Sequence, residues 1–317
     1  MSKQPPISVV NKPRKTTSRK SSSPRKSRKK DASPHKKKVV KKWEIPTGLY
    51  YILMGAITVV FLSAFFYFFI RPYSYRWKPC YGLKAYGVCM PAGFHIHGID
   101  VSHYQGNIDW QRLTQTRQSQ FPIHFIFMKA SEGGDYGDRV FQANFDSAKA
   151  YGFIRGAYHF YNPKTDPVRQ ADFFINSVKL DTGDLPPVLD IEKRGDDART
   201  LRRDLKIWLD KIERHYKVKP ILYTSYKFKT RYLNDSIFDS YPYWIAHYYV
   251  DSVEYKGNWK FWQHTDVGTL PGIREKVDLN IFNGSLEELK CMTIRFAVAY
   301  PAGVRRQLDA FVMKTVL

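Results

Sequence analysis

The stretch "PPVLDIE", residues 186–192, is a short apolar run that ends in two acids separated by one isoleucine. Continuous apolar runs of this length are typical of strands that are covered on both faces. Because side chains alternate across a strand, Asp190 and Glu192 share one face, about 6.6 Å apart along the chain. Two acids held so close repel each other, and the one in the drier surroundings binds a proton more readily. The stretch therefore predicts a strand that ends in a pair of interacting carboxyl groups.

Similar short runs recur on both sides of this stretch, and helical patterns lie between several of them. The clearest helical pattern is "ARTLRRDLKIWLDKIERHYK", residues 198–217, which follows a candidate N-cap at Asp197. Alternating strands and helices predict a parallel sheet, and eight strands predict a (β/α)8-type barrel. The runs from 243 to 283 are too close together for a helix between each pair. The candidate strands cover residues 94–102, 123–131, 154–161, 186–192, 219–225, 243–248, 259–265 and 276–282.

Acids recur at the ends of the predicted strands, where barrels of this type carry their working residues. Asp100 lies in the first strand, Asp190 and Glu192 in the fourth, and Asp278 in the last. The first and last strands are neighbours in a closed barrel, so we expect Asp100 and Asp278 to meet. The sequence thus predicts four acids at one mouth of the barrel.

Aromatic residues also gather at or near the predicted strand ends, although any one of them could equally belong to the core. As a group they suit a sugar, whose apolar ring face stacks on aromatic rings. Glycosidic cleavage needs one carboxyl group to protonate the leaving oxygen and a second group to stabilise the cation-like centre. We therefore expect a carbohydrate-cleaving site. The candidate substrate-binding aromatics are Tyr136, Tyr158, Phe160, Tyr223, Trp244 and Tyr248.

The order of these pieces resembles the glycoside hydrolase family 25 lysozymes, which cleave the β-1,4 bond between N-acetylmuramic acid and N-acetylglucosamine in peptidoglycan. The resemblance runs from about Gly98 to Leu289. It implies a flattened barrel with an incomplete set of helices, peptidoglycan strands as the partner, and no cofactor. The matching stretches are "GIDVSHYQGNIDW", "FIFMKASEGGDYGDRVFQANFDSAKAYGFIRGAYHFY", "PPVLDIE", "KPILYTS", "YWIAHY", "FWQHT" and "VDLNIFNG".

The resemblance also implies roles for the acids. Glu192 is expected to be the general acid/base, and Asp190 to orient or polarise the 2-acetamido group of the substrate. Asp100 and Asp278 complete an acidic quartet, and Gln263 of "FWQHT" is expected to bind substrate. Independently of the family, a general acid must be protonated near neutral pH, and a like charge at Asp190 favours a raised pKa for Glu192.

The N-terminal part is strongly basic and then strongly apolar. Residues 1–42 hold sixteen Lys and Arg against one acid, Asp31, which accounts for +15 of the net charge of +22. Rich in Ser and Pro and free of aromatics, this stretch predicts a disordered tail. Residues 48–70 carry no charge, and a helix over 46–70 is long enough to span a membrane. A cleaved signal peptide would have a shorter apolar region.

The basic side of such a helix stays in the cytoplasm, so everything after Arg71 is expected in the periplasm or outside the cell. The tail is then a topology signal that can also contact anionic lipid. No nucleic-acid partner is expected, because nothing aromatic accompanies the charge. The remaining divisions are a juxtamembrane linker over 71–93, the barrel over 94–290, and a C-terminal segment of unknown role over 291–317.

Cysteine and histidine spacings predict no metal site. Cys80 and Cys89 flank a short loop and are a plausible disulfide pair outside the cytoplasm, which leaves Cys291 over. His95, His97 and His103 lack the helical spacing and carboxylate of a zinc site.

Two other functions are compatible with these residues: a non-catalytic peptidoglycan-binding anchor and a chitinase-like glycosidase. The presence of all four acids argues against the first. Chitinases that end a strand in DxE usually carry a longer run of alternating acids than "PPVLDIE" offers.

Overall fold

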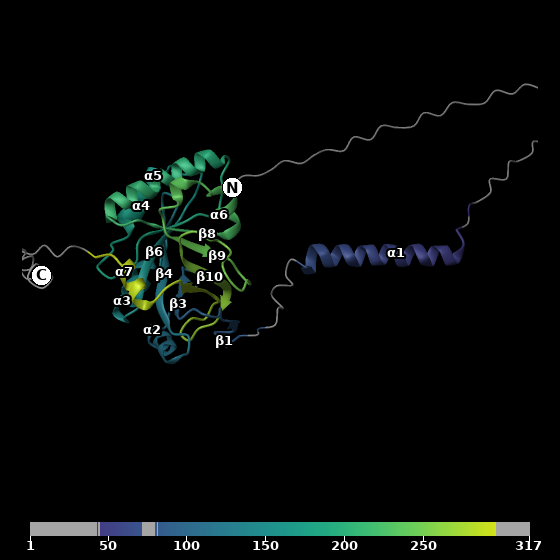
Figure 1. Ribbon diagram of the computed structural model, residues 1–317, viewed down its shortest axis with the longest axis horizontal. Coiled ribbons are helices and arrows are strands. Elements are labelled where there is room, and N and C mark those ends of the chain that lie inside the picture. Colours follow the sequence, from purple (N-terminus) through teal and green to yellow (C-terminus); the bar gives the residue numbers. More distant parts are fainter. Residues whose placement is uncertain (1–42, 44, 72–79, 81, 296–317) are drawn as a thin grey trace, which may run out of the picture. The chain divides into compact units, whose positions relative to one another are not determined.

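The computed structural model describes residues 43, 45–71, 80 and 82–295 (Figure 1). The expected basic tail over 1–42 and most of the expected C-terminal segment, 296–317, lie outside the described residues. The chain divides into two compact units, residues 1–64 and 65–317, and each is described by itself.

The N-terminal apolar stretch is helical. Helix α1 (Thr47–Phe65) continues as a π-helical segment, η1 (Phe66–Ile70). None of the side chains of α1 is buried. By length and composition the 24 residues from Thr47 to Ile70 are sufficient to cross a membrane.

The second unit contains a closed barrel. Its eight strands follow one another around the ring in the order β3, β11, β10, β9, β8, β7, β6 and β4, and β3 also pairs with β4 to close it. The short strand β5 (Tyr136–Gly137) adds to the edge of β4. This confirms the predicted closed eight-stranded barrel. The strands are β3 (Ile96–Val101), β4 (Ile123–Glu132), β6 (Ile154–Phe160), β7 (Val188–Asp190), β8 (Ile221–Ser225), β9 (Tyr243–Ala246), β10 (Trp259–Gly268) and β11 (Val277–Phe282).

The barrel is not the regular (β/α)8 type, because β11 runs antiparallel to both of its neighbours, β10 and β3. The connection from β10 to β11 spans only residues 269–276. A parallel return needs a crossover of a dozen or more residues, so the chain reverses instead. The expectation that Asp278 ends its strand is therefore wrong: Asp278 is the second residue of β11, and the reversal brings it to the same mouth.

Helices cover only part of the outside of the barrel (Figure 1). Within the described residues, neither 247–258 nor 269–276 contains a helix, which agrees with the predicted incomplete set. Helix α5 begins where Asp197 accepts a hydrogen bond from the backbone N–H of Thr200. The helical elements of this unit are α2 (Trp110–Leu113), η3 (Thr114–Gln118), α3 (Phe141–Ala150), α4 (Pro167–Ser177), α5 (Ala198–Tyr216), α6 (Tyr226–Tyr232), η4 (Ser236–Phe238) and α7 (Leu286–Met292).

Strand alternation produces two separate cores. The outer core packs the helices against the strands and includes Leu205 and Trp208 of α5. The inner core fills the lower barrel with aromatic rings, such as Phe127 stacked on Trp244 at 4.5 Å between centroids. Two glycines, Gly98 and Gly156, make room for these rings. A Cβ at Gly98 would lie 2.4 Å from the ring of Phe125.

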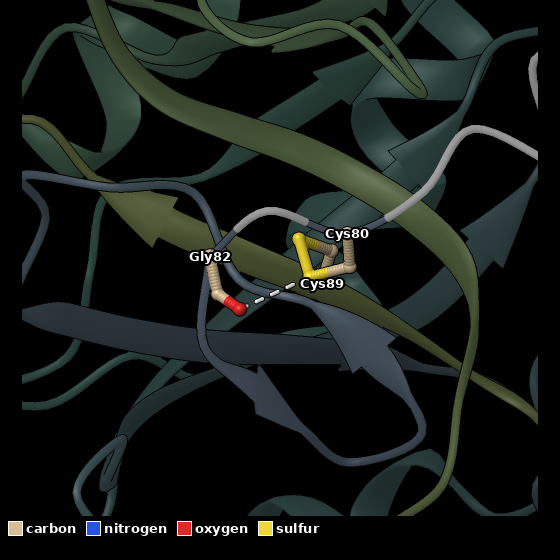
Figure 2. The surroundings of a disulfide bond; sticks show 3 residues. All are labelled: Cys80, Gly82 and Cys89. Carbon is tan, nitrogen blue, oxygen red and sulfur yellow. Dashed lines mark hydrogen bonds between the residues drawn. A yellow bond between two sulfur atoms is a disulfide. The ribbon is translucent and has the colours of Figure 1, made fainter.

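A small disulfide-closed hairpin packs against the barrel beside β10. It consists of β1 (Lys84–Ala85) and β2 (Val88–Cys89), and Cys80 bonds to Cys89 (Figure 2). The hydroxyl of Tyr86 donates to the carbonyl of Phe121 at 2.6 Å, and the N–H of Thr269 donates to the carbonyl of Tyr86 at 2.8 Å. The expected linker over 71–93 therefore includes a folded segment from residue 82 onward.

The close approach at Gly98 generates a stability prediction. In Gly98→Ala the new methyl group overlaps the ring of Phe125, which is enclosed by other rings and cannot move away. We expect a loss of about 1–3 kcal/mol in the free energy of unfolding, the usual cost of overpacking. Chemical denaturation of the full chain in detergent measures it. Gly137→Ala is the matched control, because its Cβ meets no atom closer than 3.9 Å. Equal stability of the two variants would contradict the proposed packing.

Candidate active site

The four predicted acids line one cavity of about 340 Å³. The cavity lies at the end of the barrel where parallel strands such as β3 and β7 finish, which is called the upper end below. Asp278 is paired in register with Asp100 across β11 and β3. Asp190 ends β7, and Glu192 follows two residues later. Most of the predicted substrate-binding residues line the same cavity: Tyr158, Phe160, Tyr223, Trp244, Tyr248 and Gln263.

Tyr136 does not line this cavity. It lies on β5, where its side chain is exposed and its ring is 6.1 Å from that of His103. The Tyr136 ring nevertheless lies 5.8 Å from Nζ of Lys129, a residue that does line the cavity.

Strand alternation explains how the acids reach the interior. Along β7, Val188 belongs to the inner core and Leu189 to the outer core, so Asp190 points inward. Ile191 returns to the outer core, which leaves Glu192 on the inner side at the rim. The spacing of two residues thus places both carboxyl groups on the cavity wall.

Asp100 is fixed by a chain of side-chain amides. Its Oδ2 accepts hydrogen bonds from Gln263 Nε2 at 2.8 Å and Asn280 Nδ2 at 2.7 Å. The amide oxygen of Gln263 in turn accepts from the hydroxyls of Tyr223 at 2.7 Å and Tyr248 at 2.6 Å. Because these phenols can donate only to an oxygen here, they orient the amide so that its N–H₂ group faces Asp100.

Asp100 and Asp278 share a proton. Burial raises the pKa of Asp100 above its usual range, and hydrogen bonds from Asn280, Gln263 and Asp278 oppose the rise. Burial, followed by the charge of Asp100, raises the pKa of Asp278 further. Two adjacent carboxyl groups cannot both ionise in a dry site. Asp278 therefore holds the proton and donates it in a hydrogen bond to Asp100.

Asp190 and Glu192 differ in their surroundings. Asp190 is buried, and burial followed by the charge of Glu192 raises its pKa well above the usual range. One of its carboxylate oxygens, Oδ1, is buried without a hydrogen-bond partner in the described part of the chain. This oxygen is an unused acceptor on a residue that lines the cavity.

Glu192 stands at the rim with part of its side chain open to solvent. Desolvation by the surrounding protein raises the pKa of Glu192, and the charges of Lys193 and Lys129 oppose the rise. Sequence reasoning attributed the raised pKa of Glu192 to the like charge of Asp190. In the structure that repulsion acts on the more deeply buried Asp190 instead.

Sequence reasoning missed several residues of the cavity. Lys129 of β4 donates to Glu132 at 2.6 Å and is largely buried. The sequence feature that could have identified Lys129 is its position as a single cation inside the apolar run "FIFMKAS". Asp266 accepts a hydrogen bond from the hydroxyl of Tyr249 at 2.9 Å. The missed lining residues are Val101, Ser102, Tyr104, Gln105, Lys129 and Asp266.

The histidines form no metal centre within the described residues. His103 bonds to the carboxylate of Asp138 at 3.0 Å. His159 is fully buried and stacks on Trp208 of the outer core. Its position in β6 follows the alternation that turns Tyr158 and Phe160 inward.

Comparisons with known proteins agree with this geometry. Residues 99–273 match the family described as "Glycosyl hydrolases family 25". The uncharacterized protein YegX of Escherichia coli is 40% identical over 224 residues, which cover 70% of this chain and 80% of YegX. Lysozyme M1 of Streptomyces globisporus is 34% identical over 211 residues, which cover 61% of this chain and 70% of that protein.

Solved structures resemble the barrel as well. A family 25 glycosyl hydrolase from Bacillus anthracis superposes with a TM-score of 0.59 at 30% identity and covers 64% of this chain and 96% of its own. A bacterial lysozyme from Streptomyces coelicolor gives 0.58 at 30% identity and covers 63% of this chain and 98% of its own. With the family match spanning more than half of the sequence, this chain belongs to the glycosyl hydrolases of family 25 and is a glycoside hydrolase.

Proposed function

We propose that the chain is a membrane-anchored peptidoglycan hydrolase that cleaves the β-1,4 bond between N-acetylmuramic acid and N-acetylglucosamine. The observation that carries the proposal is the pair Asp190 and Glu192, which line one cavity with Asp100 and Asp278. Relatives named lysozyme support the choice of substrate.

Glu192 acts as the general acid and base. Its position at the rim gives it access both to the glycosidic oxygen and to water. In the first step the raised pKa of Glu192 keeps a proton available for the leaving oxygen. In the second step the Glu192 carboxylate takes a proton from the attacking water.

Asp190 binds and orients the 2-acetamido group of the sugar. Asp190 lines the cavity, and its unpaired oxygen Oδ1 can accept the acetamide N–H once substrate is bound. That hydrogen bond stabilises the ionised carboxylate and orients the acetamide carbonyl oxygen toward the anomeric carbon. The carbonyl oxygen then attacks as the leaving group departs, and water opens the ring formed, which retains the configuration.

A hydrogen-bonded polar cluster, called the polar floor below, lies at the same cavity as Asp190 and Glu192. It consists of Asp100, Asp278 and the side-chain amides of Gln263 and Asn280. Because Asp278 keeps its proton, the floor carries one negative charge rather than two. That single charge lies near the centre that becomes positive in the transition state, and it stabilises that centre.

The apolar helix supports anchoring in a membrane. Its 24 residues from Thr47 to Ile70 would expose their apolar surface to water in any other setting. The basic residues 1–42 then lie in the cytoplasm, against anionic lipid, and the barrel lies outside. The disulfide between Cys80 and Cys89 suits an oxidising compartment on that side.

The test of this function is mass spectrometry of the fragments that the full chain releases from purified peptidoglycan. We expect new reducing ends on N-acetylmuramic acid. New ends on N-acetylglucosamine, or cleavage of chitin oligomers at a comparable rate, would contradict the assigned bond. Binding to the wall with no release of fragments would indicate a non-catalytic anchor.

The assignment of Glu192 predicts the effect of removing its proton. In Glu192→Gln the shape is kept but proton transfer is lost, so the rate of wall hydrolysis should fall by about 10²–10⁴-fold. Release of reducing ends measures the rate, and thermal denaturation monitors folding. Glu254→Gln, an exposed glutamate on the β9–β10 connection, is the matched control. Activity near that of the wild type in Glu192→Gln removes Glu192 from this role.

The shared proton predicts how stability changes with pH. Folding raises the pKa of Asp278, so its contribution to stability is fully present below the ordinary pKa of an aspartate and is lost as the pH rises through the raised pKa. Asn in Asp278→Asn can still donate to Asp100 but does not ionise. We expect this variant to be more stable than the wild type at about pH 8, with the difference shrinking toward about pH 4.

Thermal denaturation at both pH values measures this difference. Asp251→Asn, at an exposed position, is the control and should follow the wild type. A constant difference between Asp278→Asn and the wild type across this range would contradict the shared proton.

A further inference from the structure

The loop that follows β7 carries two cations directly after Glu192. Lys193 and Arg194 are both exposed. Among the described residues, no carboxylate oxygen lies within ion-pair distance of either side chain. The guanidinium of Arg194 donates a long hydrogen bond of 3.4 Å to the carbonyl of Gly195 and lies 5.8 Å from the centroid of the Tyr232 ring. Both charges therefore lack an acidic partner in the described chain and directly follow Glu192, which lines the cavity.

Phe160 holds Lys193 over the cavity wall. The ammonium group of Lys193 lies 5.1 Å from the centroid of the Phe160 ring, and this ring lines the cavity. Attraction between a cation and a ring face restricts the otherwise flexible lysine. Lys129 approaches the same ring at 4.7 Å but is already paired with Glu132. Lys193 is thus the cation at this ring that has no acidic partner.

The position of Lys193 works against the general acid. Its positive charge lowers the pKa of Glu192, although a general acid needs its proton near neutral pH. A cation at this place is unfavourable for the first chemical step unless the substrate brings a negative charge to it. A neutral sugar chain has no such charge.

We propose that Lys193 and Arg194 bind a carboxylate of the substrate beside the bond that is cut. The inference rests on the proposed function and deepens it. In peptidoglycan, the lactyl ether of muramic acid ends in a free carboxylate when no peptide is attached. When a peptide is attached, that group is an amide and the peptide supplies carboxylates instead. In both cases the two cations select muramic acid strands over neutral chitin.

Binding to an inactive protein tests the proposal separately from cleavage. The full chain carrying Glu192→Gln, in detergent, is titrated calorimetrically with three tetrasaccharide probes. One contains muramic acid with a free lactyl carboxylate, one contains muramic acid with attached peptides, and one is chitotetraose. The comparison protein carries Lys193→Ala and Arg194→Ala in the same background.

We expect the double substitution to weaken binding of a carboxylate-bearing probe by about five- to tenfold, the range for two exposed ion pairs. The loss should diminish as salt is added, since screening removes the same attraction. Weaker binding of both muramic acid probes identifies carboxylates of either source as ligands. Weaker binding of the peptide-bearing probe alone identifies the peptide. Lys179→Ala with Arg214→Ala removes the same charge from exposed positions on α4–α5 and should bind all probes normally.

Three results would overturn the proposal: equal losses on all three probes, no loss on either muramic acid probe, or no binding of these probes to the inactive protein. Equal losses would mean that the cations act through their neighbours and not on a substrate carboxylate. A wild-type chain that binds muramic acid probes through these cations but releases no wall fragments would refute the proposed function and leave the carboxylate site standing.

Discussion

Alternation of side chains around a closed ring of strands is the constraint on which the rest of this structure depends. Every second residue must enter a narrow interior, and the lower half of that interior is filled with aromatic rings such as Phe125, Phe127 and Trp244. Glycine at position 98 is needed because two large groups cannot occupy the same layer. The upper half is left to polar side chains, and there the same alternation brings Asp100, Asp190 and Asp278 into one cavity.

Gathering these acids is unfavourable for folding, although the proposed mechanism uses all of them. Burial raises the pKa of Asp100, Asp190 and Asp278, so neutral pH works against the folded state at each of them. Amide donors and a shared proton reduce this cost for Asp100 and Asp278. Asp190 Oδ1 accepts no hydrogen bond from the described residues. In the proposed mechanism, this is the oxygen that accepts a hydrogen bond from a substrate N–H.

Much of the barrel could be predicted from the sequence because its short apolar runs and the helical patterns between them have different periods. The meeting of Asp100 and Asp278 followed from closure alone, although the direction of β11 was wrong. The direction of a strand depends on the length of the connection before it, and residues 269–276 are too few for a parallel return. Lys129 was missed because one lysine in an apolar strand gives no periodic signal, and its role depends on Glu132 and Phe160. The pKa of Glu192 could not be assigned correctly, since relative burial of Asp190 and Glu192 is a property of the folded chain.

The bridge between Cys80 and Cys89 sets the reach of the enzyme. It ties residue 80 to a hairpin packed on the barrel, and the apolar helix ends at Ile70. Ten residues span at most roughly 35 Å even when fully extended. With the helix in a membrane, as proposed, these connecting residues limit the distance between the barrel and the lipid surface. Only glycan strands close to that surface then come within reach of the barrel.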